Sequence, residues 1–128
     1  MIYIVDSYAW VEYFIGSEKG EVLRKILKDS GNKLLTPECC VAELTGWALK
    51  NSQDFDKVFA AIRANSEIMT VTLHDWIEAG RIRFEIRKKI ENFGLIDSVI
   101  LAKQREFNAL VVSGDRHFTN LPNVTFMQ

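Results

Sequence analysis

The feature that most constrains the fold is a short, unbroken run of apolar and aromatic residues at the N-terminus, Met1 to Val5, which ends at Asp6. A run without polar alternation indicates a strand covered on both faces, as central strands of parallel sheets are. Ligands of open α/β sheets bind beyond the carboxyl ends of the strands, so Asp6 is placed where a site is expected. Asp6 is equally well explained as the N-cap of the helix predicted for residues 8–15, and this stretch alone leaves both roles open.

The rest of the chain alternates strands and helices. A second wholly apolar run, residues 109–112, leads into Ser113 and Asp115, so again a buried strand ends near a carboxylate. Further strands are predicted at residues 33–36, 67–71 and 124–126, and further helices at 18–29, 37–50, 54–65, 72–90 and 96–107. This alternation predicts one α/β domain over residues 1–128, with helices on both faces of the sheet. Right-handed crossovers put the strand carboxyl ends on one edge, which would hold Asp6 and Asp115.

Two helix starts have local signals of their own. Thr36 followed by Pro37 predicts an N-cap and a first helical residue. Thr72 with Asp75 three residues later resembles a capping box. The long helix that this box opens is expected to have Leu73 and Ile77 among its apolar positions.

Composition excludes several classes of protein. Apolar residues make up 48% and charged residues 26% of the chain, which is typical of a globular protein and not of a disordered one. No apolar run approaches the roughly 20 residues that span a bilayer, and the N-terminus has the pattern of a strand, not of a signal sequence. We therefore expect a cytoplasmic protein without membrane contact. The adjacent Cys39 and Cys40 are interpreted as small core side chains, because neighbouring helical cysteines do not suit an intramolecular disulfide.

Two further carboxylates belong to the predicted helices. Glu43 falls at the border of the apolar stripe of helix 37–50, and Asp97 lies in the first turn of helix 96–107. Each has an ordinary explanation, Glu43 as a surface side chain and Asp97 as a helix cap. Their placement near the strand ends that carry Asp6 and Asp115 is what makes the set informative.

Four carboxylates that converge without a basic residue in the same turns repel one another, unless cations neutralise them. Mg²⁺ is a suitable cation, because it takes oxygen ligands and binds through one or two carboxylates together with water and substrate phosphate. An ion held in this way lowers the pKa of bound water and stabilises a leaving oxygen. The sequence therefore predicts phosphoryl transfer or phosphodiester hydrolysis, and no P-loop, HExxH or GxSxG motif competes with it.

Net charge gives a weak constraint on nucleic-acid binding. The formal charge of −1 argues against a protein that coats nucleic acid by bulk charge. A basic run does occur in the later half of helix 72–90, and such a run is most often a solvated helix face. Our candidates there for contacts to an RNA backbone are Arg81, Arg83 and Lys88.

Four motifs, in order, resemble the PIN domain, in particular the VapC-type toxin ribonucleases. They are Ile4-Val5-Asp6-Ser7, an isolated helical Glu43, the segment 95–102 around Asp97, and the segment 110–118 around Asp115. The resemblance covers essentially the whole chain. It implies a three-layer α/β/α sandwich with a parallel sheet of about five strands, and an endoribonuclease that depends on Mg²⁺ or Mn²⁺.

The resemblance also assigns roles to single residues. It implies that Asp6, Asp97 and Asp115 hold the metal, and that Glu43 binds a second ion or positions the attacking water. Ser7 and Ser113 match hydroxyl positions beside this acidic quartet, with serine at 113 where the family commonly has threonine. His117 stands where some members carry another acid; we leave it out of the metal site and expect a structural role.

The resemblance implies partners as well. It suggests a small antitoxin that covers the acidic groove, an RNA substrate that is single-stranded or structured, and a homodimer.

Two other functions fit parts of the pattern. A receiver-like signalling domain has a similar size and topology, but it needs an adjacent acidic pair after the first strand and a lysine after a late strand. Here Ser7 follows Asp6, and Asp115 stands near the expected lysine position. A catalytically inactive PIN-like binding module is the other alternative, and the intact set of carboxylates counts against it.

Overall fold

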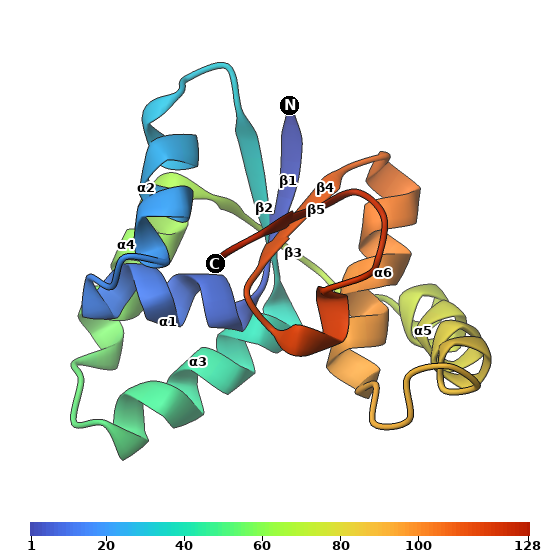
Figure 1. The fold of residues 1–128 in the computed structure, drawn as a ribbon. Helices are drawn as coiled ribbons and strands as arrows, with labels where there is room; N and C mark the ends of the chain where they lie inside the picture. The colour runs from blue at the N-terminus through green and yellow to red at the C-terminus, as the bar shows by residue number, and fades with distance from the viewer.

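The computed structural model describes residues 1–128 and contains one five-stranded sheet, all of whose neighbouring strands are parallel (Figure 1). The strand order is β3-β2-β1-β4-β5. The strands are β1 (Ile2–Val5), β2 (Lys33–Pro37), β3 (Glu67–Met69), β4 (Leu110–Ser113) and β5 (Val124–Phe126). The predicted strands are all present, and β5 lies at a sheet edge as expected. The parallel arrangement brings the carboxyl ends of the strands to one edge of the sheet.

Helices cover both faces of this sheet (Figure 1). They are α1 (Ser7–Ile15), α2 (Gly20–Lys28), α3 (Glu38–Lys50), α4 (Phe55–Asn65), α5 (Leu73–Ile86) and α6 (Leu95–Phe107), with a short 3₁₀ helix η1 (Arg116–Phe118). Figure 1 shows α1, α2 and α4 on one side of the sheet and α5 and α6 on the other. The predicted three-layer α/β/α sandwich is therefore confirmed.

The central strand β1 connects two apolar cores. Ile4 and Val5 are both fully buried, and as neighbours in a strand they point to opposite faces. Ile4 packs in the core beneath α5 and α6, and Val5 packs in the core with Trp10 of α1 and Leu23 of α2. The unbroken apolar run at the N-terminus therefore forms a strand covered on both faces, as predicted.

The first turn of α5 differs from the sequence expectation. The Thr72 and Asp75 capping box forms as predicted, but Leu73 and Ile77 are exposed, by 76% and 46%. Asp75 instead faces α6, where its carboxylate pairs with the Lys103 ammonium at 2.8 Å. This pair sets the rotation of α5, because residues four apart share a helix face and buried Ala79 follows Asp75 at that spacing. The helix also ends at Ile86, before the predicted residue 90.

Thr36 is a second difference, because it does not cap α3. Thr36 is a buried residue of β2, and its hydroxyl accepts a hydrogen bond from the Trp10 indole N–H at 3.1 Å. Pro37 occupies the N-cap position of α3 without a side-chain hydrogen bond. The threonine hydroxyl therefore stabilises the contact between β2 and α1.

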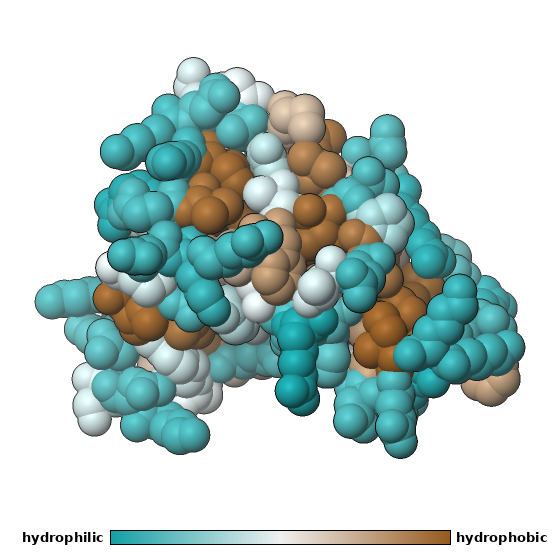
Figure 2. All heavy atoms as spheres, viewed as in Figure 1, coloured by the Kyte–Doolittle hydropathy of each residue, from teal (hydrophilic) through white to brown (hydrophobic).

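The face of the molecule seen in Figure 2 is mainly polar. Figure 2 shows hydrophilic side chains over the outer helices on both sides of this view, with apolar patches between them. No helix combines the length and the hydropathy that crossing a bilayer would need.

Candidate active site

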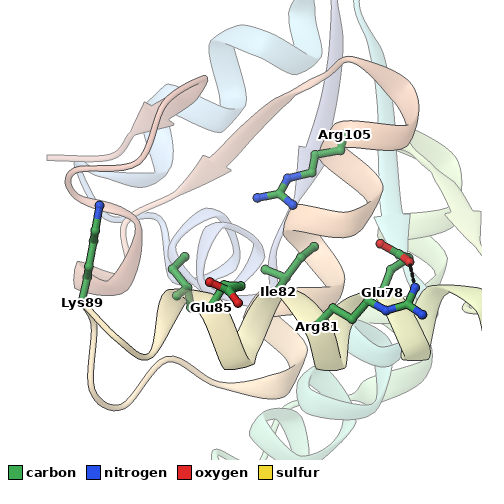
Figure 3. Close-up of a pocket in the computed structure, with 7 residues that line it drawn as sticks. Glu78, Arg81, Ile82, Glu85, Lys89 and Arg105 are labelled. Carbon is green, nitrogen blue, oxygen red and sulfur yellow. Dashed lines mark hydrogen bonds and ion pairs between the residues drawn. The ribbon is translucent and has the colours of Figure 1, made fainter.

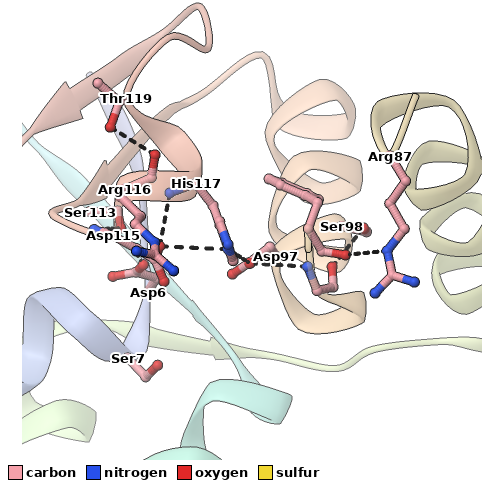
Figure 4. Close-up of polar contacts among 12 residues, drawn as sticks. Asp6, Ser7, Arg87, Asp97, Ser98, Ser113, Asp115, Arg116, His117 and Thr119 are labelled. Atoms are coloured by element: carbon pink, nitrogen blue, oxygen red, sulfur yellow. Dashed lines mark hydrogen bonds and ion pairs between the residues drawn. The ribbon is translucent and has the colours of Figure 1, made fainter. Parts of the chain in front are cut away.

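The ends of β1 and β4 bring Asp6 and Asp115 to one edge of the sheet. Val5 pairs with Val112, so Asp6 and Ser113 leave neighbouring strands side by side. The Ser113 hydroxyl donates a hydrogen bond to Asp6 Oδ2, and Ser113 Oγ accepts one from the Asp115 backbone N–H at 3.0 Å. The predicted meeting of these two acids at the strand ends is confirmed (Figure 4).

Asp6 is a buried carboxylate that also caps a helix. Its Oδ1 accepts a hydrogen bond from the Ala9 backbone N–H at 2.9 Å, so Asp6 is the N-cap of α1. Burial raises the pKa of Asp6 to about 7. The hydrogen bonds from Ser113 and Ala9 oppose this rise, while the negative charges of Asp115 and Asp97 add to it. The two roles considered for Asp6, a cap and a member of an acidic site, therefore coexist in one side chain.

Asp97 enters the same region from the start of α6. The Gly94 backbone N–H lies 3.4 Å from Asp97 Oδ2, so Asp97 also contributes to capping its own helix. The turn before this helix is held by Arg87, whose Nε donates to the Phe93 carbonyl oxygen at 2.8 Å (Figure 4). Burial raises the pKa of Asp97, and the charge of Asp115 raises it further. The hydrogen bond from His117 acts in the opposite direction.

His117 lies between two of the acids, which sequence reasoning missed. Its Nδ1 is 3.0 Å from Asp97 Oδ2 and 3.6 Å from Asp115 Oδ1. Its backbone N–H donates to Asp115 Oδ1 at 2.9 Å, because Asp115 is the N-cap of η1. The sequence contained one sign of this position: His117 follows Asp115 by two residues, in the same turn.

The turn between Ser113 and Asp115 requires a glycine. A Cβ atom added at Gly114 would collide with the ring of Tyr8 in α1 and would lie 3.1 Å from the Met127 carbonyl oxygen. Glycine alone permits such a close approach of the backbone.

Glu43 reaches the site from α3. The Ser7 hydroxyl donates a hydrogen bond to Glu43 Oε1 at 2.9 Å, and Ser7 directly follows Asp6. Burial raises the pKa of Glu43, and the charges of Asp97 and Asp115 raise it as well. Glu43 as a whole residue is exposed, which agrees with its expected position at the border of the helix stripe.

The donor atoms of this site suit a divalent cation. Asp97, Asp115 and His117 each offer one ligand atom, and these three atoms lie within 4.8 Å of one another. No lysine or arginine lies within ion-pair distance of Asp6, Glu43, Asp97 or Asp115. A cation is the natural neutralising partner for such a set, because carboxylate oxygens and imidazole nitrogen are common ligands of divalent metals.

The basic candidates lie apart from this cluster, on α5 and in the turn that follows it. Arg81 forms an ion pair with Glu78 within α5, and Lys88, in the turn, forms one with Glu85 at 3.1 Å. No hydrogen bond or ion pair connects Arg81, Arg83 or Lys88 to the four acids. Their proposed role in RNA binding stays a prediction.

Without metal, the free energy of unfolding is expected to fall as the pH rises toward 7. The pKa of Asp6 is raised from its ordinary value of 3.8 to about 7, so the folded protein keeps a proton that the unfolded chain has lost. The stabilising contribution of that proton is complete below the unfolded pKa and is lost as the pH rises through the folded one, by about 1.4 kcal/mol per pH unit. Urea unfolding in EDTA, compared between the wild type and Asp6→Asn, isolates this residue. Parallel stability curves for the two proteins would refute the assignment.

Comparisons with known proteins agree with this architecture. The family model described as PIN domain matches residues 3–124. Among solved structures, a toxin-antitoxin complex from Klebsiella pneumoniae has a TM-score of 0.77 at 16% identity and covers 98% of each chain. VapC20 of Mycobacterium tuberculosis, described as a sarcin-ricin loop cleaving toxin, has a TM-score of 0.77 at 14% identity over 98% of this chain and 99% of its own. VapBC2 of Rickettsia felis, bound to a fragment of promoter DNA, has a TM-score of 0.73 at 20% identity over 97% and 96%.

A comparison with curated proteins finds no match. The structural likenesses, at these identities, concern the fold. The family match is separate evidence, and it extends from the first strand of the sheet to the last. On this ground the chain belongs to the PIN domain family.

Proposed function

We propose that this protein is a metal-dependent endoribonuclease that hydrolyses RNA phosphodiester bonds, and that it is the toxin of a toxin-antitoxin pair. The observation that carries the proposal is the cluster at the strand ends, where Asp6, Asp97 and Asp115 meet Glu43 without a lysine or arginine partner. The raised pKa values of Asp6, Glu43 and Asp97 indicate carboxylates that are unfavourably charged until a cation neutralises them.

Each residue has a role in this proposal. Asp6, Asp97 and Asp115 would hold Mg²⁺ or Mn²⁺, and Glu43 would hold a second ion or orient the attacking water. A bound ion of this kind lowers the pKa of water and offsets the charge of the scissile phosphate. The Ser113 hydroxyl holds the Asp6 carboxylate, and the Ser7 hydroxyl holds that of Glu43. Attack of water on the phosphorus releases a 3′-hydroxyl and a 5′-phosphate.

Metal removal tests the proposal directly. The purified protein is expected to cut single-stranded RNA in Mn²⁺ or Mg²⁺, to lose that activity in EDTA and to regain it when the ion is restored. Analysis of the product ends should show 3′-hydroxyl and 5′-phosphate groups. Cleavage that persists in EDTA, or products with 2′,3′-cyclic phosphate, would indicate a different mechanism.

A groove between α5 and α6 supports a second part of the proposal, contact with the RNA backbone. The groove has a volume of about 380 Å³, and Figure 3 shows Arg105 of α6 facing α5 across it. Its lining residues are Glu78, Arg81, Ile82, Glu85, Ile86, Lys89 and Arg105. The lining has three basic and two acidic side chains, so its net charge is positive and favours a phosphate backbone.

Salt dependence of RNA binding tests this contact. Arg81→Gln is expected to reduce the slope of log affinity against log salt by about 0.7, the value for one phosphate of a single strand. The same test applies to Arg83 and Lys88, which line a separate hollow beside this groove. Lys57→Gln on α4 is a matched control, because that helix covers the opposite face of the sheet. Equal slopes for the wild type and the Arg81, Arg83 and Lys88 variants would remove this surface from the proposal.

The partners follow from the structural neighbours. Several are toxin-antitoxin or VapBC complexes, which supports a small antitoxin for this chain. A homodimeric state and action on RNA in the cytoplasm are further parts of the proposal, which these neighbours do not address. The match to the PIN family model argues against the receiver-like alternative. An inactive PIN-like binding module remains the competing function, and the cleavage assay above decides between the two.

A further inference from the structure

We propose that His117 is a ligand of the metal together with Asp97 and Asp115, and that its nitrogen gives the site a preference for Mn²⁺ over Mg²⁺. The inference rests on the proposed function for the existence of a metal site. It adds to that function the identity of a nitrogen ligand and the class of ion that the ligand selects.

The position of the imidazole fits a ligand. Nδ1 is 3.0 Å from Asp97 Oδ2 and 3.6 Å from Asp115 Oδ1. Two ligand atoms that lie about 2.1 Å from an ion, at a right angle, are about 3.0 Å apart. A hydrogen bond to Asp97 also explains the shorter distance, but 3.6 Å is too long for a hydrogen bond to Asp115. A shared ion explains both approaches at once.

The ring is held in this orientation by its surroundings. The backbone of His117 is fixed by its hydrogen bond to Asp115 Oδ1 at the start of η1. The imidazole packs against the fully buried ring of Phe93, with the two ring centres 5.8 Å apart. Its side chain is only 22% exposed. Nδ1 therefore points to the carboxylates because of packing, before any ion binds.

The chemistry of the ligand determines the ion. Mg²⁺ prefers oxygen ligands and keeps several of its waters, so an imidazole adds little to its binding. Mn²⁺ also favours oxygen ligands, but as a first-row transition ion it accepts an imidazole nitrogen more readily than Mg²⁺ does. A set of two carboxylates and one imidazole is therefore expected to bind Mn²⁺ more tightly than Mg²⁺, whereas a site of carboxylates alone discriminates less.

Pulsed EPR of the wild-type protein with bound Mn²⁺ is the decisive measurement. A directly bound nitrogen gives a ¹⁴N coupling to the manganese, which a merely structural histidine does not produce. We expect that coupling in the wild type. Its absence in wild-type protein that binds Mn²⁺ would overturn the proposal. The test therefore does not depend on whether a variant folds.

Variants extend the test to metal preference. His117→Asn places an amide oxygen near the position of Nδ1, so Mg²⁺ affinity should be kept and Mn²⁺ affinity should fall at least about tenfold, with loss of the ¹⁴N coupling. His74→Asn, in the exposed first turn of α5, is the control and should change neither affinity. An unchanged ratio of Mn²⁺ to Mg²⁺ affinity in His117→Asn would also overturn the proposal.

RNA cleavage, measured on the same samples, separates the two proposals. Cleavage with bound Mn²⁺ but no ¹⁴N coupling refutes the role of His117 and leaves the nuclease intact. The coupling without any cleavage supports His117 as a ligand and refutes the nuclease. A protein that binds no Mn²⁺ refutes both.

Discussion

Replacing Asp6 by asparagine is expected to abolish metal-dependent RNA cleavage, while the melting temperature stays the same or rises. The amide oxygen still accepts the hydrogen bond from Ala9 that caps α1. Because burial raises the pKa of Asp6 to about 7, the neutral amide is favoured in this position over the carboxylate near neutral pH. A bound ion contributes several kcal/mol to such reactions, and a loss of about 4 kcal/mol corresponds to roughly 10³ in rate. Initial cleavage rates in Mn²⁺ and thermal melts of the same samples measure both effects.

The matched control is Asp56→Asn, which neutralises an exposed carboxylate in the first turn of α4. It should leave the cleavage rate unchanged. Cleavage by Asp6→Asn near the wild-type rate would show that another site or a contaminant cuts the RNA. Loss of both rate and melting temperature would mean that the capping role of Asp6 dominates.

Replacing Lys103 by methionine is expected to lower the free energy of unfolding by about 3–5 kcal/mol, the usual effect of removing one partner of a buried ion pair. Lys103 and Asp75 are only 6% and 7% exposed, and their charged atoms lie 2.8 Å apart between α6 and α5. Burial acts to raise the pKa of Asp75, but the hydrogen bonds from Lys103 and Thr72 lower it overall. Without Lys103, a buried carboxylate is left uncompensated. Urea unfolding at neutral pH measures the loss.

Two further variants test why Lys103→Met lowers the free energy of unfolding. The double variant Asp75→Asn and Lys103→Met should recover much of the lost stability, because asparagine still accepts the hydrogen bond from the Thr72 backbone N–H. Lys88→Met breaks an ion pair of similar length, 3.1 Å, whose side chains are 59% and 68% exposed, and should cost less than about 1 kcal/mol. Equal losses for Lys103→Met and Lys88→Met would show that burial does not strengthen the pair.

The strands and the six α-helices were predictable from the chain because they depend on local patterns. The apolar run before Asp6 requires cover on both faces, and the spacing of Thr72 and Asp75 alone defines a helix start. The gathering of Asp6 and Asp115 followed from the parallel topology, since both residues come directly after paired strands.

The rotation of α5 was not predictable, because a partner distant in sequence determines it. Hydrophobic periodicity alone does not show that Asp75 would be buried against Lys103, which leaves Leu73 and Ile77 in solvent. The contact of His117 with Asp97 was not predictable for a similar reason. Its place depends on how η1 folds back toward Asp97, a contact between two separate segments of the chain.

Sequence patterns also left the choice between cap and site open for Asp6. The structure shows why no choice was needed. One oxygen of Asp6 accepts from the Ala9 backbone, and the other accepts from the Ser113 hydroxyl. Where a helix starts directly after a strand end, capping the helix also orients the carboxylate. A capping signal at such a place therefore does not argue against a functional site.

The central position of β1 in the sheet determines how late in synthesis the acidic cluster can form. β1 is synthesised before the other strands of the sheet, yet its neighbour β4 is residues 110–113, and Asp115 and His117 follow later still. A partly synthesised chain carries Asp6 and Glu43 without the other half of their pocket. Since small domains fold as units, the acidic cluster forms only after β4 and η1 have been synthesised. Until then the nascent chain lacks half of the proposed site.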